Sequence, residues 1–138
     1  MADRPARLDS RDVECFVGSA HADLDAVRKL ADKEPELINA AWDWGGGDWE
    51  TALGAAAHMG QRDIAEFLLE RGARLDVFAA AMLGHVEIVR AVIDAFPQTR
   101  VARGPHGIPL LAHAEKGGEP ANPVVELLKN TLVGGGRR

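Results

Sequence analysis

Apolar residues recur along the chain at the spacing of amphipathic helices. The clearest stretches are 63–70 and 86–93, where they return every three or four positions. A short alanine-rich stretch precedes each of them, at 55–57 and 79–81, and a glycine lies between the two parts. This pattern predicts two units of helix, turn and helix. Because one such unit cannot bury its apolar face alone, we expect neighbouring copies to stack.

The order of residues in these units resembles the ankyrin repeat. Its pattern is Thr-Pro-Leu-His-x-Ala-Ala-x-x-Gly-His, followed by an Ile-Val-x-x-Leu-Leu outer helix and Gly-Ala. The residues in register are Thr51, Leu53, Ala56, Ala57, Gly60, Ile64, Leu68, Leu69, Gly72 and Ala73 in the first unit, and Ala80, Ala81, Gly84, His85, Glu87, Ile88, Val89 and Ile93 in the second. Ala52 and Gly54 replace the proline and histidine of the family, and weaker copies flank both units.

The resemblance implies an all-α ankyrin solenoid of about four helix-turn-helix repeats with short, irregular finger loops. The chain has 138 residues, 46% of them hydrophobic, which suits one domain with its own core. We expect this single domain to cover residues 1–133 and the tail 134–138 to be disordered. The repeats are placed approximately at 11–40, 49–74, 75–97 and 104–131.

The spacing of the turns indicates that the fingers are unequal. Gly60 follows the first turn, at Ala22, by 38 residues, Gly84 follows Gly60 by 24, and Gly117 follows Gly84 by 33. Only the last interval equals the ankyrin period of about 33 residues. We therefore expect an enlarged second finger, a missing third finger, and a notch on the concave side of the solenoid.

Composition narrows the classes of partner. The net charge of −5 argues against nucleic acid and anionic membranes, because phosphate binding needs clustered Lys and Arg. No stretch approaches the roughly 18 apolar residues of a membrane span, so a cytoplasmic protein is expected, most simply a monomer. The single cysteine, Cys15, is expected to be buried. The sequence holds no common nucleotide, zinc-protease or serine-hydrolase motif, and no cofactor is expected.

All three tryptophans lie in the segment 41–50, together with three consecutive glycines. Tryptophan is enriched in binding hot spots because a rigid ring buries a large area at small entropic cost. Trp44 borders the glycines and is the first choice for a contact with a ligand or partner, and Trp49 is the second.

The resemblance also implies a binding face, formed by the finger tips and by the residues just before each inner-helix glycine. We expect an apolar floor in the middle of the groove with acidic and imidazole groups around it. The finger residues carried over to this face are Asp48, Glu50, Pro105 and Gly107, and the helix residues are the pairs Ala20-His21, His58-Met59, Met82-Leu83 and Glu115-Lys116. His106, in the fourth finger where the family usually has a glycine, is a further candidate for this face.

Histidine placement leaves a second interpretation open. His58, His106 and His113, grouped with Asp48 or Glu50, would suit proton transfer on a small molecule. Two imidazoles and a carboxylate would also suit a divalent metal, but the spacing does not indicate one, and no metal is expected. The structural interpretation is that His113 bonds a backbone carbonyl, while His85 is part of a turn and His21 is solvated.

Two functions are therefore carried forward. The first is a binding module that recognises a protein or ligand through its concave face, without enzymatic activity. The alternative is a small acid/base enzyme or small-molecule-binding protein that uses a notch of His, Asp and Trp side chains on that face. A purely structural role, with the groove closed by a second copy of the chain, is the third possibility. The sequence does not identify the partner.

Overall fold

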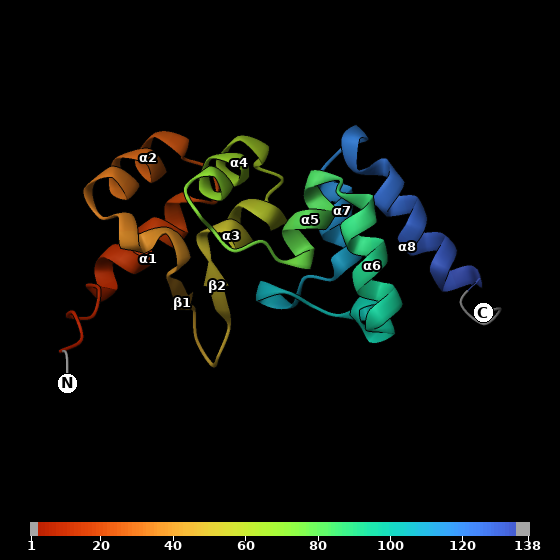
Figure 1. The fold of residues 1–138 in the computed structure, drawn as a ribbon, viewed down its shortest axis with the longest axis horizontal. Coiled ribbons are helices and arrows are strands. Elements are labelled where there is room, and N and C mark those ends of the chain that lie inside the picture. Colours follow the sequence, from red (N-terminus) through yellow and green to blue (C-terminus); the bar gives the residue numbers. More distant parts are fainter. Residues whose placement is uncertain (1–2, 135–138) are drawn as a thin grey trace.

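The structure, a computed structural model, describes residues 3–134 and is predominantly helical, in agreement with the expected all-α class (Figure 1). The α-helices follow one another in pairs: α1 (Ser10–Ser19) and α2 (Leu24–Lys33), α3 (Ala52–His58) and α4 (Arg62–Glu70), α5 (Val77–Leu83) and α6 (Val86–Ala95), and α7 (Leu110–Lys116) and α8 (Asn122–Gly134). Four short 3-10 helices connect them: η1 (Pro35–Asn39), η2 (Pro97–Val101), η3 (Pro105–Gly107) and η4 (Glu119–Ala121). Between the first two pairs lies a hairpin of β1 (Ala41–Asp43) and β2 (Trp49–Thr51).

Side chains at the starts of four helices fix where these helices begin. Asp9, Asp23, Thr51 and Asp76 each accept a hydrogen bond from a backbone N–H in the first turn of α1, α2, α3 and α5 respectively. These bonds satisfy donors that a helix leaves free at its N-terminus. Polar residues just before the apolar stretches therefore set the boundaries locally.

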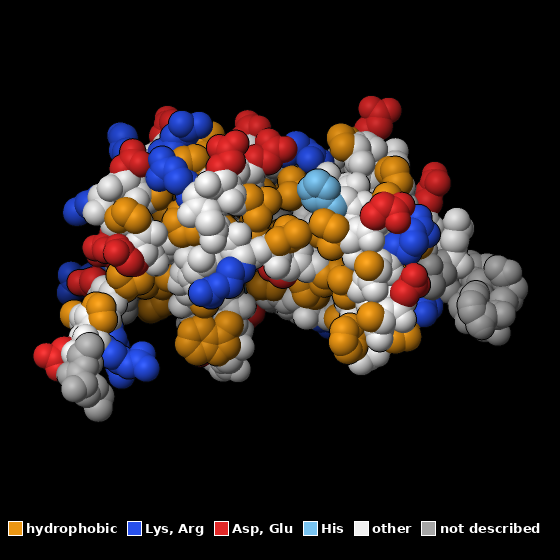
Figure 2. Space-filling view, in the orientation of Figure 1, with side chains coloured by type: hydrophobic (Ala, Val, Ile, Leu, Met, Phe, Trp, Pro, Cys, Tyr) orange, Lys and Arg blue, Asp and Glu red, His pale blue; other side chains and the backbone are white. Residues whose placement is uncertain are grey.

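The inner helices α3, α5 and α7 form the centre of the molecule. Their alanines, at 55–57 and 79–81, are fully buried, so that α5 packs closely against both α3 and α7. The apolar stripes of the outer helices cover this layer, with Leu68 of α4 and Val89 of α6 completely buried. Charged side chains gather on the outside over α2 and α4 (Figure 2).

The packing of α5 corrects the expected apolar floor of the groove. Met82 is fully buried and Leu83 is 7% exposed, because helices α3 and α7 contact α5. The backbone carbonyls of both residues accept hydrogen bonds from the Arg62 guanidinium, at 3.3 and 3.1 Å. Met82 and Leu83 are therefore core residues and offer no surface to a partner.

Cys15 was expected to be buried, but it is exposed. Helix α1 buries Val13, Phe16 and Val17, and a helix advances about 100° per residue. Cys15 therefore falls outside the buried stripe.

The third helix pair lacks a finger, as the short interval between Gly60 and Gly84 predicts. The chain leaves α4 and reaches the N-cap Asp76 of α5 without a hairpin. Helix α7 contacts α3 as well as α5, so the second and fourth pairs meet. Of the expected tail 134–138, residues 135–138 lie outside the described part of the chain. Its first residue, Gly134, is the last residue of α8. None of the helices in residues 3–134 has the length and apolar character that crossing a membrane demands.

Candidate functional site

The hairpin between the first two helix pairs carries the centre of the candidate site. Its strands pair Ala41 with Thr51, and its tip contains Gly45–Gly47, all with positive φ angles of 137°, 63° and 89°. Asp43 Oδ1 accepts hydrogen bonds from the backbone N–H groups of Gly45 and Gly47, at 2.8 and 3.0 Å. Residues with side chains rarely adopt such φ angles, so the three glycines allow the tight turn.

Glu50 lies at the middle of the site and is only 1% exposed. Successive residues of a strand point to opposite faces, so Glu50 turns inward while its neighbour Trp49 remains 60% exposed. Trp44 reaches across the hairpin, and its indole Nε1–H donates to Glu50 Oε1 at 2.8 Å. Gly54 packs beside the Glu50 side chain, since a Cβ there would be in van der Waals contact with Glu50 Cγ at 3.5 Å.

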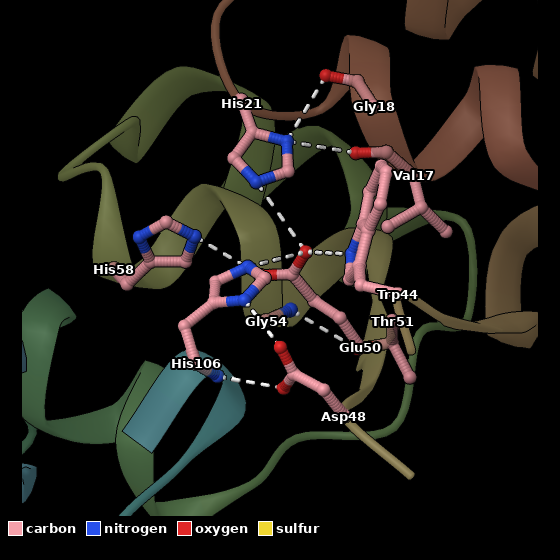
Figure 3. Close-up of polar contacts among 10 residues, drawn as sticks. All are labelled: Val17, Gly18, His21, Trp44, Asp48, Glu50, Thr51, Gly54, His58 and His106. Carbon is pink, nitrogen blue, oxygen red and sulfur yellow. Dashed lines mark hydrogen bonds and ion pairs between the residues drawn. The ribbon is translucent and has the colours of Figure 1, made fainter. Parts of the chain in front are cut away.

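Three imidazoles from three separate segments surround this carboxylate (Figure 3). His21 Nε2 and His106 Nε2 each lie 3.3 Å from Glu50 Oε1, and His58 Nε2 lies 3.0 Å from Glu50 Oε2. The His58 ring centroid is 5.0 Å from that of His21 and 5.1 Å from that of His106. His21 belongs to the turn after α1, His58 ends α3, and His106 comes from η3.

His106 is held by Asp48 at two points. Asp48 Oδ2 lies 2.7 Å from His106 Nδ1, and Asp48 Oδ1 accepts the His106 backbone N–H, also at 2.7 Å. His106 has a φ of 61°, the only positive φ of a non-glycine residue in the described part of the chain. Such backbone strain persists only where surrounding contacts enforce it. The contact with Asp48 therefore fixes the fourth finger against the hairpin.

The charges of the site shift three of its pKa values. Burial by itself raises the pKa of Glu50, but the contacts with His58 and Trp44 and the nearby His21 and His106 outweigh it, so this pKa is lowered. The backbone N–H of His106 is the main cause that lowers the pKa of Asp48. Burial lowers the pKa of His106, but Asp48 and Glu50 overcome this effect and raise it. Carboxylate and imidazole thus stabilise each other's charged form.

A comparison with known families gives the identity of part of this site. Residues 48–79 match the family model of the ankyrin repeat. This segment of the chain is an ankyrin repeat. The matched segment begins at Asp48 and includes Glu50, α3 with His58, and α4. No curated protein and no solved structure shows significant similarity to the chain.

Several residues predicted for the site lie on the surface near the cluster. Trp44 and Met59 are each 38% exposed. A groove of about 400 Å³ adjoins the cluster at His58, and its lining includes Met59, Ile108, Ala112, Glu115 and Lys116. Hydrophobic side chains also show at the free end of the hairpin (Figure 2). Apolar surface of this kind is typical of interaction sites.

His113 lies outside the cluster. Its Nδ1 is 2.9 Å from the carbonyl oxygen of Pro109, and its ring packs on Phe78 with centroids 4.8 Å apart. The residue is fully buried, and this burial lowers its pKa. This contact agrees with the expectation that His113 has a structural role and bonds a backbone carbonyl. The structure does not bring His113 together with His58, His106 and Asp48 around one point.

His21 was not predicted to join the imidazole cluster. It was expected to be solvated, but its Nδ1 lies 3.1 Å from the Val17 carbonyl oxygen and 3.0 Å from that of Gly18, while Nε2 faces Glu50. Glu50 was expected either on a finger tip facing a partner or grouped with His58 and His106, and the structure places it with these two imidazoles. No local sequence signal relates His21 to Glu50.

Proposed function

We propose that the protein is a binding module of four ankyrin repeats, at about 11–40, 49–74, 75–97 and 104–131, which form one domain over residues 1–133. Its partner is a protein, recognised by the concave side on which the hairpin lies. The observation that carries the proposal is the ankyrin match over residues 48–79, since ankyrin repeats generally mediate protein interactions. The four stacked helix pairs support it.

Within this proposal the exposed residues beside the cluster make the contacts. Trp49 is the most exposed tryptophan of the hairpin, Trp44 borders the cluster through Glu50, and Met59 lines the groove. Tryptophan side chains commonly contribute most of the energy of an interface. His58, His106 and Asp48 add polar selectivity at the edge. Glu50 holds the imidazoles in place from the interior of the protein and makes no contact with the partner.

The test begins with a partner captured from native cells by cross-linking and identified by mass spectrometry. Its affinity for the purified protein is then measured with Trp49→Ala, Met59→Ala and Ile88→Ala variants. Trp49→Ala is expected to weaken binding by roughly tenfold or more, and Met59→Ala by less. Ile88 on α6 is the matched control, because it is 39% exposed against 38% for Met59.

The result would contradict the proposal if the Ile88→Ala variant lost affinity while the Trp49→Ala and Met59→Ala variants bound as the unsubstituted protein does. Recognition would then belong to the outer helices.

A second candidate function is acid/base chemistry on a small molecule at the same site. The observation that favours it is the convergence of His58 and His106 on Glu50, directly beside the groove of about 400 Å³. Native mass spectrometry of the purified protein tests it. A retained organic molecule that His58→Ala loses and His85→Ala keeps would support this function, and a protein free of any such molecule would argue against it.

A further inference from the structure

We propose that His21, Glu50, His58 and His106 form a binding site for one divalent transition-metal ion, with Zn²⁺ the expected occupant. This inference does not rest on the proposed recognition of a protein partner. It departs from the sequence-based expectation that no metal binds, which did not include His21 among the possible ligands.

The distances among the donor atoms suit a small tetrahedral ion. One nitrogen from each histidine and one oxygen of Glu50 all lie within 4.8 Å of one another. Zinc binds imidazole nitrogen and carboxylate oxygen at about 2.0–2.2 Å, so adjacent ligand atoms in a tetrahedron are about 3.3 Å apart. His21 Nε2 and His106 Nε2 each lie 3.3 Å from Glu50 Oε1, and His58 Nε2 lies 3.0 Å from Glu50 Oε2. Because the largest separation in the set is up to 4.8 Å, the donors must draw together when an ion binds.

Two of the imidazoles are oriented as ligands usually are. A carbonyl oxygen can only accept a hydrogen bond, so His21 Nδ1 donates its proton to Val17 and Gly18. In the same way His106 Nδ1 donates to the Asp48 carboxylate. Each neutral ring then presents the lone pair of Nε2 to the centre. Metal-binding histidines typically have such an acceptor on the second nitrogen, which fixes the tautomer and the ring.

The remaining two donor atoms, Glu50 Oε2 and His58 Nε2, are buried and have no hydrogen-bond partner elsewhere in the described residues. They lie 3.0 Å apart and form an ion pair only when the imidazole is protonated. Leaving buried polar atoms unpaired is costly. A metal ion at the centre would satisfy the carboxylate oxygen and the imidazole nitrogen together.

The donor set also selects the kind of ion. Imidazole nitrogen suits Zn²⁺, Cu²⁺ and Ni²⁺, whereas Mg²⁺ and Ca²⁺ prefer oxygen ligands. Four protein ligands close the coordination of a tetrahedral Zn²⁺ and leave no open position for substrate. The ion would therefore act structurally, by joining the turn after α1, the hairpin, the end of α3 and the fourth finger.

The test uses untagged protein that has been treated with a chelator and then titrated with Zn²⁺ alone. Isothermal titration calorimetry is expected to give one ion per chain, and bound Zn²⁺ is expected to raise the melting temperature. Glu50→Gln and His106→Ala should each weaken Zn²⁺ binding by tenfold or more. Asp48→Asn, which removes only the positioning contact, should weaken it by roughly 10–100-fold without changing the stoichiometry. His85→Ala is the control and should bind as the unsubstituted protein does.

A measurement on the unsubstituted protein covers the case in which a variant does not fold. In ¹⁵N–¹H spectra of the imidazole rings, Zn²⁺ should shift the Nε2 signals of His21, His58 and His106 and leave His85 and His113 unchanged. The proposal is overturned if Zn²⁺ does not bind, if the signals of His85 or His113 shift instead, or if folded His106→Ala binds Zn²⁺ with undiminished affinity.

Discussion

Burial separates the two methionines that the sequence placed together on the expected binding face. Met59 directly precedes the turn glycine Gly60, and Met82 lies two residues before Gly84. Met59 is 38% exposed and Met82 is fully buried. The difference arises because α5 is covered on both sides by α3 and α7, which the local pattern does not reveal.

At the residue scale we therefore predict opposite results for Met82→Ala and Met59→Ala. Met82→Ala should lower the free energy of unfolding by about 2–5 kcal/mol, because it leaves a cavity in the core. Met59→Ala should change it by less than about 0.5 kcal/mol, as is usual for surface positions. Urea denaturation followed by circular dichroism measures both values. Equal losses for the two variants would place Met82 outside the core.

At the scale of the elements, glycines at the turns let helix pairs approach one another. Gly84 has a φ of 88°, and a Cβ there would lie 2.4 Å from the carbonyl oxygen of Pro120. Gly72 has a similar φ of 96°, but nothing lies within 4 Å of its Cβ position. A comparison of substitutions at these two glycines therefore distinguishes the cost of backbone strain, which both share, from the cost of close packing, which only Gly84 has.

We predict that Gly84→Ala destabilises the protein more than Gly72→Ala. Both substitutions force a residue into the left-handed region, at a cost of about 1–2 kcal/mol. Gly84→Ala adds the collision with Pro120, for which overpacking suggests a further 1–3 kcal/mol. The midpoints of thermal unfolding compare the two variants. If their midpoints coincide, the turn after α5 does not pack against η4 as described.

At the scale of the whole molecule, contacts cross between the second and fourth helix pairs. In a linear repeat array each unit contacts only its neighbours, and parts of the array can unfold separately. Here α7 contacts α3 as well as α5, and Asp48 bonds His106 across 58 positions of sequence. These contacts couple the hairpin to the C-terminal half.

We therefore predict that the molecule unfolds in one transition. All three tryptophans lie at positions 42–49, so tryptophan fluorescence reports on the hairpin, whereas far-ultraviolet circular dichroism reports on all the helices. Both signals should give the same midpoint in urea, with the metal removed by a chelator. A fluorescence midpoint at clearly lower urea would mean that the hairpin detaches first.

The sequence by itself determined the features that depend on neighbouring residues. The apolar spacing in 63–70 and 86–93 fixed the outer helices, and Gly60 and Gly84 marked the turns, because helix periodicity and positive φ are local properties. The interval between these two glycines likewise predicted the missing finger.

Tertiary structure alone decided which side chains surround Glu50. His21, Glu50, His58 and His106 are spread over 86 residues, and no local pattern relates them. They meet where α7 contacts α3 and where Asp48 of the hairpin bonds His106 of the fourth finger. Burial and contact between distant segments depend on how the helix pairs pack, and this packing is settled only when the whole chain has folded.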